Sequence, residues 1–312
     1  MTATTDTFFD RSTPARVGVT ALNLLLPGLG LIRLGHGREG ILIGAGALAM
    51  LWLMAGLALA LPVGTFAMQG LILAWFYLVY ITFLFFSIVR TWPKSRRDRG
   101  EQWWSRWYAI VLWWVLSITS SFASSGLLHL SYKPFYVASE SMVPTLMKDE
   151  KLIADMRWHQ PQIGTIVLFR DPQHIVRIYR VAAVGGQTFE MRNGVPIIDG
   201  HPAIQKPKGE MPAPVSWSGQ DTGQVFAEHL PGEAGSHRIL LIGEGAPRNV
   251  PAIRLPAGTM YLLGDDRDLA PDSRVGPDMG GVGVMPASAI MGRPLYLTWS
   301  KDRNRIGQRA DH

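Results

Sequence analysis

The sequence predicts a membrane-anchored protein in which N-terminal α-helical transmembrane segments precede an all-β soluble domain. Hydrophobic residues make up 47% of the 312 residues, and they crowd into long uncharged runs within the first 130 positions, as in membrane proteins. Beyond Tyr132 the sequence changes to short β-like runs separated by glycine and proline, which is typical of several small sheets or a distorted barrel. The length favours about two domains, and we predict a membrane domain at 1–130 and a β domain at 131–312.

The composition excludes several kinds of site. The chain has no cysteine, which excludes disulfides, iron–sulfur clusters and thiolate zinc sites; we expect no metal and no cofactor. The formal net charge is +6, and much of it lies in one short segment beside a membrane span, where the positive-inside rule accounts for it. We therefore expect no nucleic-acid partner. The sequence does not predict an oligomeric state.

The first uncharged stretch, residues 17–32, is the weakest membrane segment. It has sixteen residues between Arg16 and Arg33, and these include Asn23 and Pro27, whereas a span needs about 20 apolar residues. We favour a re-entrant or interfacial segment here over a true span.

Three stronger segments follow, and each is uncharged and long enough to span: residues 40–62, 66–89 and 107–130. The first two are joined by three residues and should form a tight antiparallel hairpin. The loop 90–106 holds six Lys/Arg against two acidic residues, which predicts a cytoplasmic loop. The third span would then carry residues 131–312 out of the cytoplasm.

The soluble half contains several β-like runs bounded by turn residues: residues 164–170, 175–184, 195–199, 238–242 and 259–263. Residues 206–256 are rich in proline and glycine. We expect an irregular inserted lobe of loops and hairpins there.

Two serines stand two positions apart in residues 139–146, Ser-Glu-Ser-Met-Val-Pro-Thr-Leu. If this stretch is extended, Ser139 and Ser141 point the same way. One hydroxyl could then attack a carbonyl while the other donates to the oxyanion that forms. Taken alone, the stretch is more typical of a loop with small residues, so the interpretation depends on later stretches.

Four stretches, taken in order, resemble the sequence boxes of the bacterial type I signal peptidases. Residues 139–146 are similar to S-x-S-M-x-P-T-L, and residues 164–169 to G-D-I-V-x-F, with Thr165 where aspartate is usual. Residues 180–187 are similar to R-V-x-G-x-P-G-D, and residues 264–274 to G-D-N-R-D-N-S-x-D-S-R. The resemblance covers about residues 131–301 and implies a signal peptidase-like β fold.

The resemblance also implies roles for individual residues. Ser141 matches the nucleophile, and Ser139 matches the serine that assists the oxyanion hole. Phe135, Tyr136 and Val137 match a strand edge that contacts the outer leaflet and pairs with the substrate. Seven residues match positions that support the structure of the active site: Arg180, Asp265, Arg267, Asp268, Asp272, Ser273 and Arg274. Among them, Asp272 and Arg274 match a charge pair.

The implied partners are signal peptides of exported precursor proteins, cleaved after small residues of the Ala-x-Ala type, and the phospholipid bilayer. The implied location is the inner (cytoplasmic) membrane. The chain would cross it several times, with the C-terminal domain on the periplasmic or extracytoplasmic side.

The sequence departs from the family pattern at the general base. The family has a lysine immediately before the arginine that Arg180 matches, and this chain has Tyr179; Ala270 replaces the serine that hydrogen-bonds that lysine. Burial lowers the pKa of a lysine, so that its neutral amine accepts a proton. Burial raises the pKa of a tyrosine above about 10. We therefore expect Tyr179 to be neutral and a poor base.

Other candidate bases are weaker. Arg177, two residues from Tyr179 on the same strand face, stays protonated. His174 would face the other side of a regular strand, roughly 16 Å from Tyr179, and we interpret Lys148 and Lys151 as surface charges. Two hypotheses stay open: a signal peptidase I-like serine endopeptidase with an altered base, or a catalytically impaired relative that binds signal peptides or membrane-protein partners without cleaving.

Overall fold

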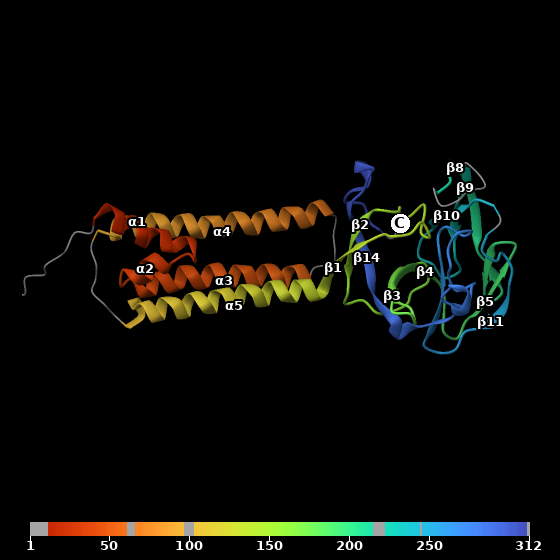
Figure 1. Ribbon diagram of the computed structural model, residues 1–312, viewed down its shortest axis with the longest axis horizontal. Helices are drawn as coiled ribbons and strands as arrows, with labels where there is room; N and C mark the ends of the chain where they lie inside the picture. The colour runs from red at the N-terminus through yellow and green to blue at the C-terminus, as the bar shows by residue number, and fades with distance from the viewer. Residues whose placement is uncertain (1–11, 61–65, 97–102, 215–221, 244, 311–312) are drawn as a thin grey trace, which may run out of the picture. The chain divides into compact units, whose positions relative to one another are not determined.

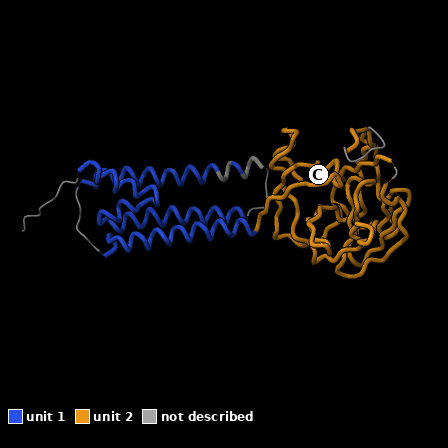
Figure 2. Tube along the Cα trace, viewed as in Figure 1, with its two compact units in different colours: residues 1–130 blue, residues 131–312 orange. Residues whose placement is uncertain are grey.

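The computed structural model describes residues 12–60, 66–96, 103–214, 222–243 and 245–310. The chain divides into two compact units, Met1–Leu130 and Ser131–His312 (Figure 2). The predicted hairpin connection at residues 63–65 and residues 97–102 of the basic loop lie outside the described residues.

The first unit is helical. Its elements are α1 (Thr13–Ala21), η1 (Leu22–Leu24), α2 (Leu29–Arg33), α3 (Gly37–Ala60), α4 (Phe66–Lys94), η2 (Trp103–Ser105) and α5 (Trp107–Ser131). Within the described ranges, three helices are long and apolar enough to cross a membrane, at Gly37–Ala60, Ala74–Lys94 and Trp107–Ser131. Helix α3 contacts α4 and lies beside α5 (Figure 1). Trp52 Nε1 of α3 donates to Ser120 Oγ of α5 at 2.8 Å. These helices indicate that the protein associates with a membrane.

Residues 17–32 do not form one continuous helix. They run through α1, η1 and the start of α2, and the break falls at Gly28, which has a φ of 97°. A Cβ on Gly28 would lie 2.1 Å from the carbonyl oxygen of Gly40. Only glycine fits here, because it tolerates positive φ and lets the backbone approach α3 this closely.

Asn23 stabilises this break. Its side chain is fully buried, and it bonds to both the broken segment and α4. Oδ1 accepts from the N–H groups of Gly28 and Gly30, both at 3.1 Å, and from Ser87 Oγ at 2.6 Å, while Nδ2 donates to Thr20 O and Thr91 Oγ1, both at 3.0 Å.

The second unit is built on a curled sheet of seven antiparallel strands, in the order β1-β2-β14-β3-β4-β12-β13. The strands are β1 (Tyr132–Tyr136), β2 (Lys151–Asp155), β3 (Ile166–Arg170), β4 (Val176–Val184), β12 (Thr259–Leu263), β13 (Met285–Pro286) and β14 (Ile290–Trp299). Strand β14 pairs with β2 and with β3, and its register shifts several times. Such bulges bend a strand and increase its twist, so the sheet curls around its core.

Two smaller sheets complete this unit. One has the order β11-β5-β6-β7 and contains β5 (Thr188–Arg192), β6 (Val195–Ile198), β7 (His201–Pro202) and β11 (Val250–Arg254). The other has the order β10-β9-β8 and contains β8 (Ile204–Pro212), β9 (Thr222–His229) and β10 (His237–Leu241). Short 3₁₀ turns lie at η3 (Pro277–Met279), η4 (Ala287–Ala289) and η5 (Arg303–Arg305). The predicted fold class, apolar helices followed by an all-β domain of several sheets, is confirmed.

Residues 206–256, where we expected an irregular lobe of loops and hairpins, contain longer strands than the sequence indicated. These residues supply most of the β10-β9-β8 sheet, and β11 joins a different sheet by pairing with β5. Strand β8 was not predicted, because it contains Pro207 and Gly209. These two residues lie at a register shift in β8, which is an edge strand. Proline is tolerated at such positions because an edge strand leaves some N–H groups unpaired.

Residues 137–150, between β1 and β2, carry the predicted nucleophile Ser141, and we call them the nucleophile loop. This loop is anchored in two hydrophobic clusters. Met142 and Leu146 are buried in the cluster inside the curled sheet, together with Tyr179 and Ala270. Val143 is buried in another cluster, with Val225 of β9 and Leu240 and Ile242 of the β10 region. The loop therefore packs against the curled sheet on one side and the β10-β9-β8 sheet on the other.

Candidate active site

Ser139 and Ser141 lie together in the nucleophile loop. Their Oγ atoms are 3.4 Å apart, and Ser141 is 8% exposed while Ser139 is open to solvent. The segment is a series of turns, with Val143 N–H donating to Glu140 O and Leu146 N–H to Met142 O. The stretch is therefore not extended, and turns bring the same two hydroxyls together.

The C-terminal segment holds the nucleophile loop through Glu150. Glu150 Oε1 accepts from Ser300 Oγ at 2.8 Å and from Arg305 Nε at 2.6 Å, and Oε2 accepts from Met147 N–H at 2.8 Å. Arg305 Nη2 also donates to Thr145 O at 2.8 Å. Because Glu150 is buried, these bonds are shielded from water and keep the loop in one conformation.

Tyr179 lies beside Ser141. It is 3% exposed, its ring centroid is 5.8 Å from that of Phe169, and its hydroxyl donates to Pro271 O at 3.2 Å. Ser141 and Arg177 lie close enough to this hydroxyl to lower its pKa. The structure therefore brings the predicted nucleophile and the residue at the predicted base position into contact.

The surroundings keep Tyr179 neutral. Burial raises the pKa of its hydroxyl, and the Asp272 carboxylate raises it further. The charge of Arg177 and the hydrogen bonds from Ser141 and Arg177 lower it, but by less, so the pKa stays above its ordinary value of about 10. Arg177 itself is paired, with its Nε 2.7 Å from Asp171 Oδ2.

Ala270 and Gly264 fill the space behind Ser141. A Cβ on Gly264 would lie 2.1 Å from Ala270 Cβ and 2.6 Å from Ser141 O. Tyr179 and Ala270, which replace the family's lysine and its serine partner, belong to the same buried cluster.

The remaining candidate bases are exposed. His174 lies in the turn between β3 and β4 with a φ of 63°, not on the strand as the distance estimate had assumed, because β4 begins only at Val176. Lys148 and Lys151 are exposed too.

Arg180 and Asp265 form a buried pair behind the site. Arg180 Nε donates to Asp265 Oδ1 at 2.8 Å and Nη2 to Oδ2 at 2.6 Å, and both side chains are excluded from solvent. Burial raises the pKa of Asp265, but the charge and hydrogen bonds of Arg180 outweigh it and hold the pKa below its usual range. Thr145 Oγ1 also donates to Asp265, which connects the pair to the nucleophile loop.

Asp272 and Arg274 form a second bidentate pair. Arg274 Nε and Nη2 donate to the two carboxylate oxygens of Asp272, both at 2.8 Å, and Asp272 Oδ2 also accepts from Gly264 N–H at 2.9 Å. Ser273 Oγ accepts from Leu262 N–H at 2.9 Å. These bonds fix the loop 264–274 against β12.

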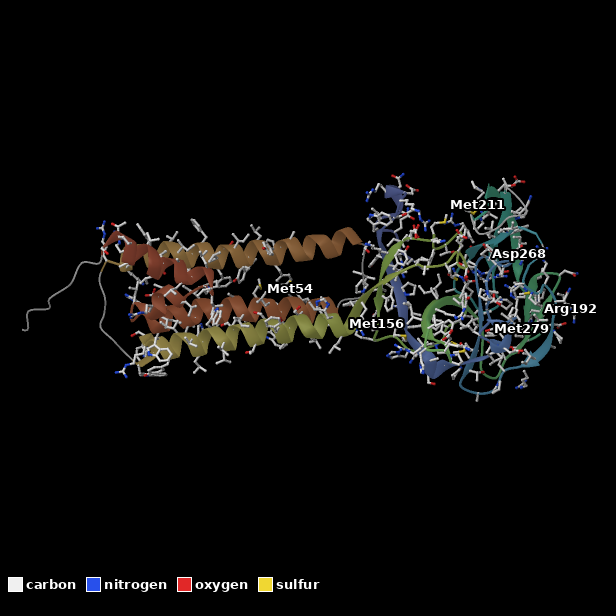
Figure 3. All side chains as sticks on the ribbon, in the orientation of Figure 1. Met54, Met156, Arg192, Met211, Asp268 and Met279 are labelled. Carbon is white, nitrogen blue, oxygen red and sulfur yellow. The ribbon has the colours of Figure 1, made fainter. Side chains whose placement is uncertain are left out.

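Arg267 and Asp268 connect the loop 264–274 to other elements. Arg267 pairs with the buried Glu228 of β9. Asp268 accepts from Ile242 N–H at 2.7 Å and pairs with Arg248 at 3.1 Å. Figure 3 shows Asp268 among the strands of the β unit. Sequence reasoning missed Glu228, Arg248 and Glu150, because their partners are distant in the chain and nothing local in the sequence marks them.

Strand β1 has an open edge. It pairs with β2 and stands at the end of the strand order of the described sheet. Of the three residues predicted to bind substrate, Phe135 is half-buried, Tyr136 is exposed with its hydroxyl bonded to Asp149, and Val137 is buried in the core. The unpaired edge has the geometry that an added peptide strand needs. In the part of the chain that is described, no group of three or more His, Asp or Glu side chains is arranged to hold a metal.

The chain matches a family model over residues 106–299, and the family is described as signal peptidase, peptidase S26. The protein belongs to this signal peptidase family. It is 27% identical over 183 residues to a probable signal peptidase I-1 of Synechocystis sp., covering 55% of this chain and 73% of the relative. It is 22% identical over 208 residues to a signal peptidase I of Bacillus amyloliquefaciens, covering 65% and 89%. A signal peptidase I of Leptolyngbya laminosa is 23% identical over 185 residues, covering 55% and 70%.

Proposed function

We propose that this signal peptidase family member is a membrane-bound serine endopeptidase that removes signal peptides from exported proteins, with Ser141 as its nucleophile. The observation that carries the proposal is the position of Ser141, within 3.4 Å of a second serine hydroxyl and in contact with Tyr179.

The substrate would bind along β1. An extended cleavage region of the Ala-x-Ala type adds to the open edge of this strand through backbone hydrogen bonds, and its small side chains need only shallow pockets. Tyr136 is the exposed side chain of β1 nearest the nucleophile loop. The Ser139 hydroxyl lies where it can donate to the oxyanion that forms when Ser141 attacks the scissile carbonyl.

Removal of the Ser141 proton is the difficult step. The family pattern assigns it to a lysine, and a neutral phenol that already donates to Pro271 O does not accept a proton readily. We therefore propose that cleavage by this chain is slow. The same observation favours a second candidate function, in which the chain binds signal peptides without cleaving them.

The proposed function is tested with the full chain in detergent and an exported precursor as substrate. Cleavage by wild type that is lost in Ser141→Ala supports the peptidase. Binding of a labelled signal peptide without cleavage by either form supports the binding function. Absence of both binding and cleavage refutes both.

We also propose that residues 1–130 form a multi-pass membrane domain and that residues 131–312 lie outside the cytoplasm. The six basic residues of the loop 90–106 support this orientation, as do the three helices long enough to span.

A further inference from the structure

Asp266 lies next to Ser141, yet the mechanism above does not use it. Its backbone N–H donates to Ser141 O at 3.1 Å, and its side chain is fully buried. Oδ1 accepts from the backbone N–H groups of Asp268 at 3.3 Å and Leu269 at 3.1 Å. Oδ2 is buried too, and among the described residues it has no hydrogen-bond partner.

This arrangement suits a neutral carboxyl group. An ionised carboxylate buried without a cation or a full set of donors is costly, whereas a protonated one has an acceptor oxygen and a hydroxyl. Burial raises the pKa of Asp266 to about 7; the hydrogen bonds from Leu269 and Asp268 oppose this, and the charges of Asp268 and Glu140 add to it.

Charged groups act on Asp266 from its own loop and from the nucleophile loop. Carboxylates face it from Glu140 on the nucleophile loop and from Asp268 on its own loop. The arginines of neighbouring elements are paired with other carboxylates: Arg248 with Asp268, Arg267 with Glu228 and Arg180 with Asp265. The imidazole of His237 lies near Glu228 and Glu233.

Ionisation of Asp266 would act on the site through Glu140. Glu140 lies between Ser139 and Ser141 in the sequence, so repulsion between the two carboxylates pushes on the segment that carries both hydroxyls. The family pattern has an asparagine where Asp266 stands. A neutral aspartic acid resembles that amide, because it too has one acceptor oxygen and one donor.

We propose that Asp266 acts in its neutral form as a positioning residue for Ser141, and that its ionisation loosens the nucleophile loop and weakens the action of the protein on signal peptides. This inference rests on the proposed function of Ser141.

The first test compares wild type with Asp266→Asn, which keeps the amide-like hydrogen bonding and cannot ionise. The ratio of wild-type to Asp266→Asn cleavage rates cancels the pH dependence that both share. We expect this ratio to be constant below about pH 6 and to fall as the pH rises through about 7, as the neutral form is depleted. If the chain binds without cleaving, the ratio of signal-peptide affinities replaces the ratio of rates. A ratio that does not change with pH overturns the positioning role.

The second test needs no activity. The pKa of Asp266 is higher in the folded than in the unfolded chain, so its contribution to stability is full below about pH 4 and is lost as the pH rises towards about 7. Relative to Asp266→Asn, wild type should lose thermal stability across that range and level off above it. Asp278→Asn is the matched control, because Asp278 is exposed on η3.

The outcomes separate the two proposals. If the thermal stabilities of wild type and Asp266→Asn change with pH in the same way, Asp266 is not neutral in the folded protein, whatever the cleavage rate. Absence of binding and cleavage in every variant and at every pH refutes the proposed function, and the positioning role with it.

Discussion

Tyr179 and Ser141 place a phenol and a serine hydroxyl in contact where the family pattern has an amine and a serine. The difference is asymmetric, because the same burial that makes a lysine a usable base makes a tyrosine a weaker acid that keeps its proton. The structure adds Arg177 to this site, and its cation does not offset the burial of Tyr179. The serine pair is therefore retained beside a group that donates a hydrogen bond.

The serine pair leads to a first prediction. Ser141→Ala should abolish any cleavage while folding and membrane insertion persist, because only the hydroxyl is removed. Ser139→Ala should raise the barrier by about 2.7–4 kcal/mol, the usual cost of one oxyanion donor. Precursor cleavage followed on gels measures both effects. Equal rates for wild type and Ser141→Ala would remove Ser141 from the mechanism.

A second prediction restores the family's pair of residues at positions 179 and 270. Tyr179→Lys combined with Ala270→Ser should cleave faster than wild type, because burial lowers the pKa of the new amine and the new hydroxyl orients it. Tyr179→Lys alone should gain less. The close contact of Ala270 with Gly264 sets how well the added hydroxyl fits. Rates for the three forms on one precursor give the comparison.

Tyr179→Phe is the control for that experiment. A wild type that already cleaves briskly and slows strongly in Tyr179→Phe would make the tyrosine hydroxyl part of the mechanism. A brisk wild type that Tyr179→Phe leaves unchanged would place the base elsewhere.

Among the secondary-structure elements, several short apolar strands were predictable from the sequence, including β6, which contains Pro196 and ends one residue before its predicted end. Strand β12 matches its predicted range, and β4 begins one residue after the predicted start. Strand β8 was missed, because Pro207 and Gly209 are tolerated at its register shift. The two serine hydroxyls meet as expected, but through turns, since proximity at a site depends on the whole loop and not on the local periodicity.

The contacts that hold the site were the least predictable part. The pairs Arg267–Glu228 and Arg248–Asp268 join residues 20 or more positions apart. No periodicity in the sequence encodes such a contact, because it depends on how the β10-β9-β8 sheet packs against the loop 264–274.

The broken segment at the start of the chain gives a prediction for the helical unit. Asn23→Ala removes five hydrogen bonds from a buried position. It should destabilise the packing of residues 17–32 on α4 by about 2.5–5 kcal/mol, since each bond contributes roughly 0.5–1 kcal/mol. Unfolding in detergent, followed by tryptophan fluorescence, measures the loss. Thr82→Ala is the control, because Thr82 is exposed and bonds to its own helix. Equal stability of the two variants would contradict the role of Asn23.

The chain as a whole combines a helical unit that has three potential spans with a β unit that carries the serine pair. Export requires the two units to have a defined orientation across the membrane, and the basic loop predicts it. An alkaline-phosphatase fusion at Lys133 should be active, and one at Arg99 inactive, because alkaline phosphatase folds to its active form only outside the cytoplasm. The reverse pattern would overturn the orientation and the export role together.

The hydrogen bonds from Ser300 and Arg305 to Glu150 affect where the chain can be truncated or tagged. The family match ends at residue 299. A gene trimmed to the matched region would therefore lack both side-chain partners of the buried Glu150 carboxylate and would release the nucleophile loop. An inactive fragment of that kind would imitate a pseudoenzyme for a reason unrelated to Tyr179. Affinity tags and truncations therefore belong at the N-terminus, and a negative assay is informative only when residues 300–310 are intact.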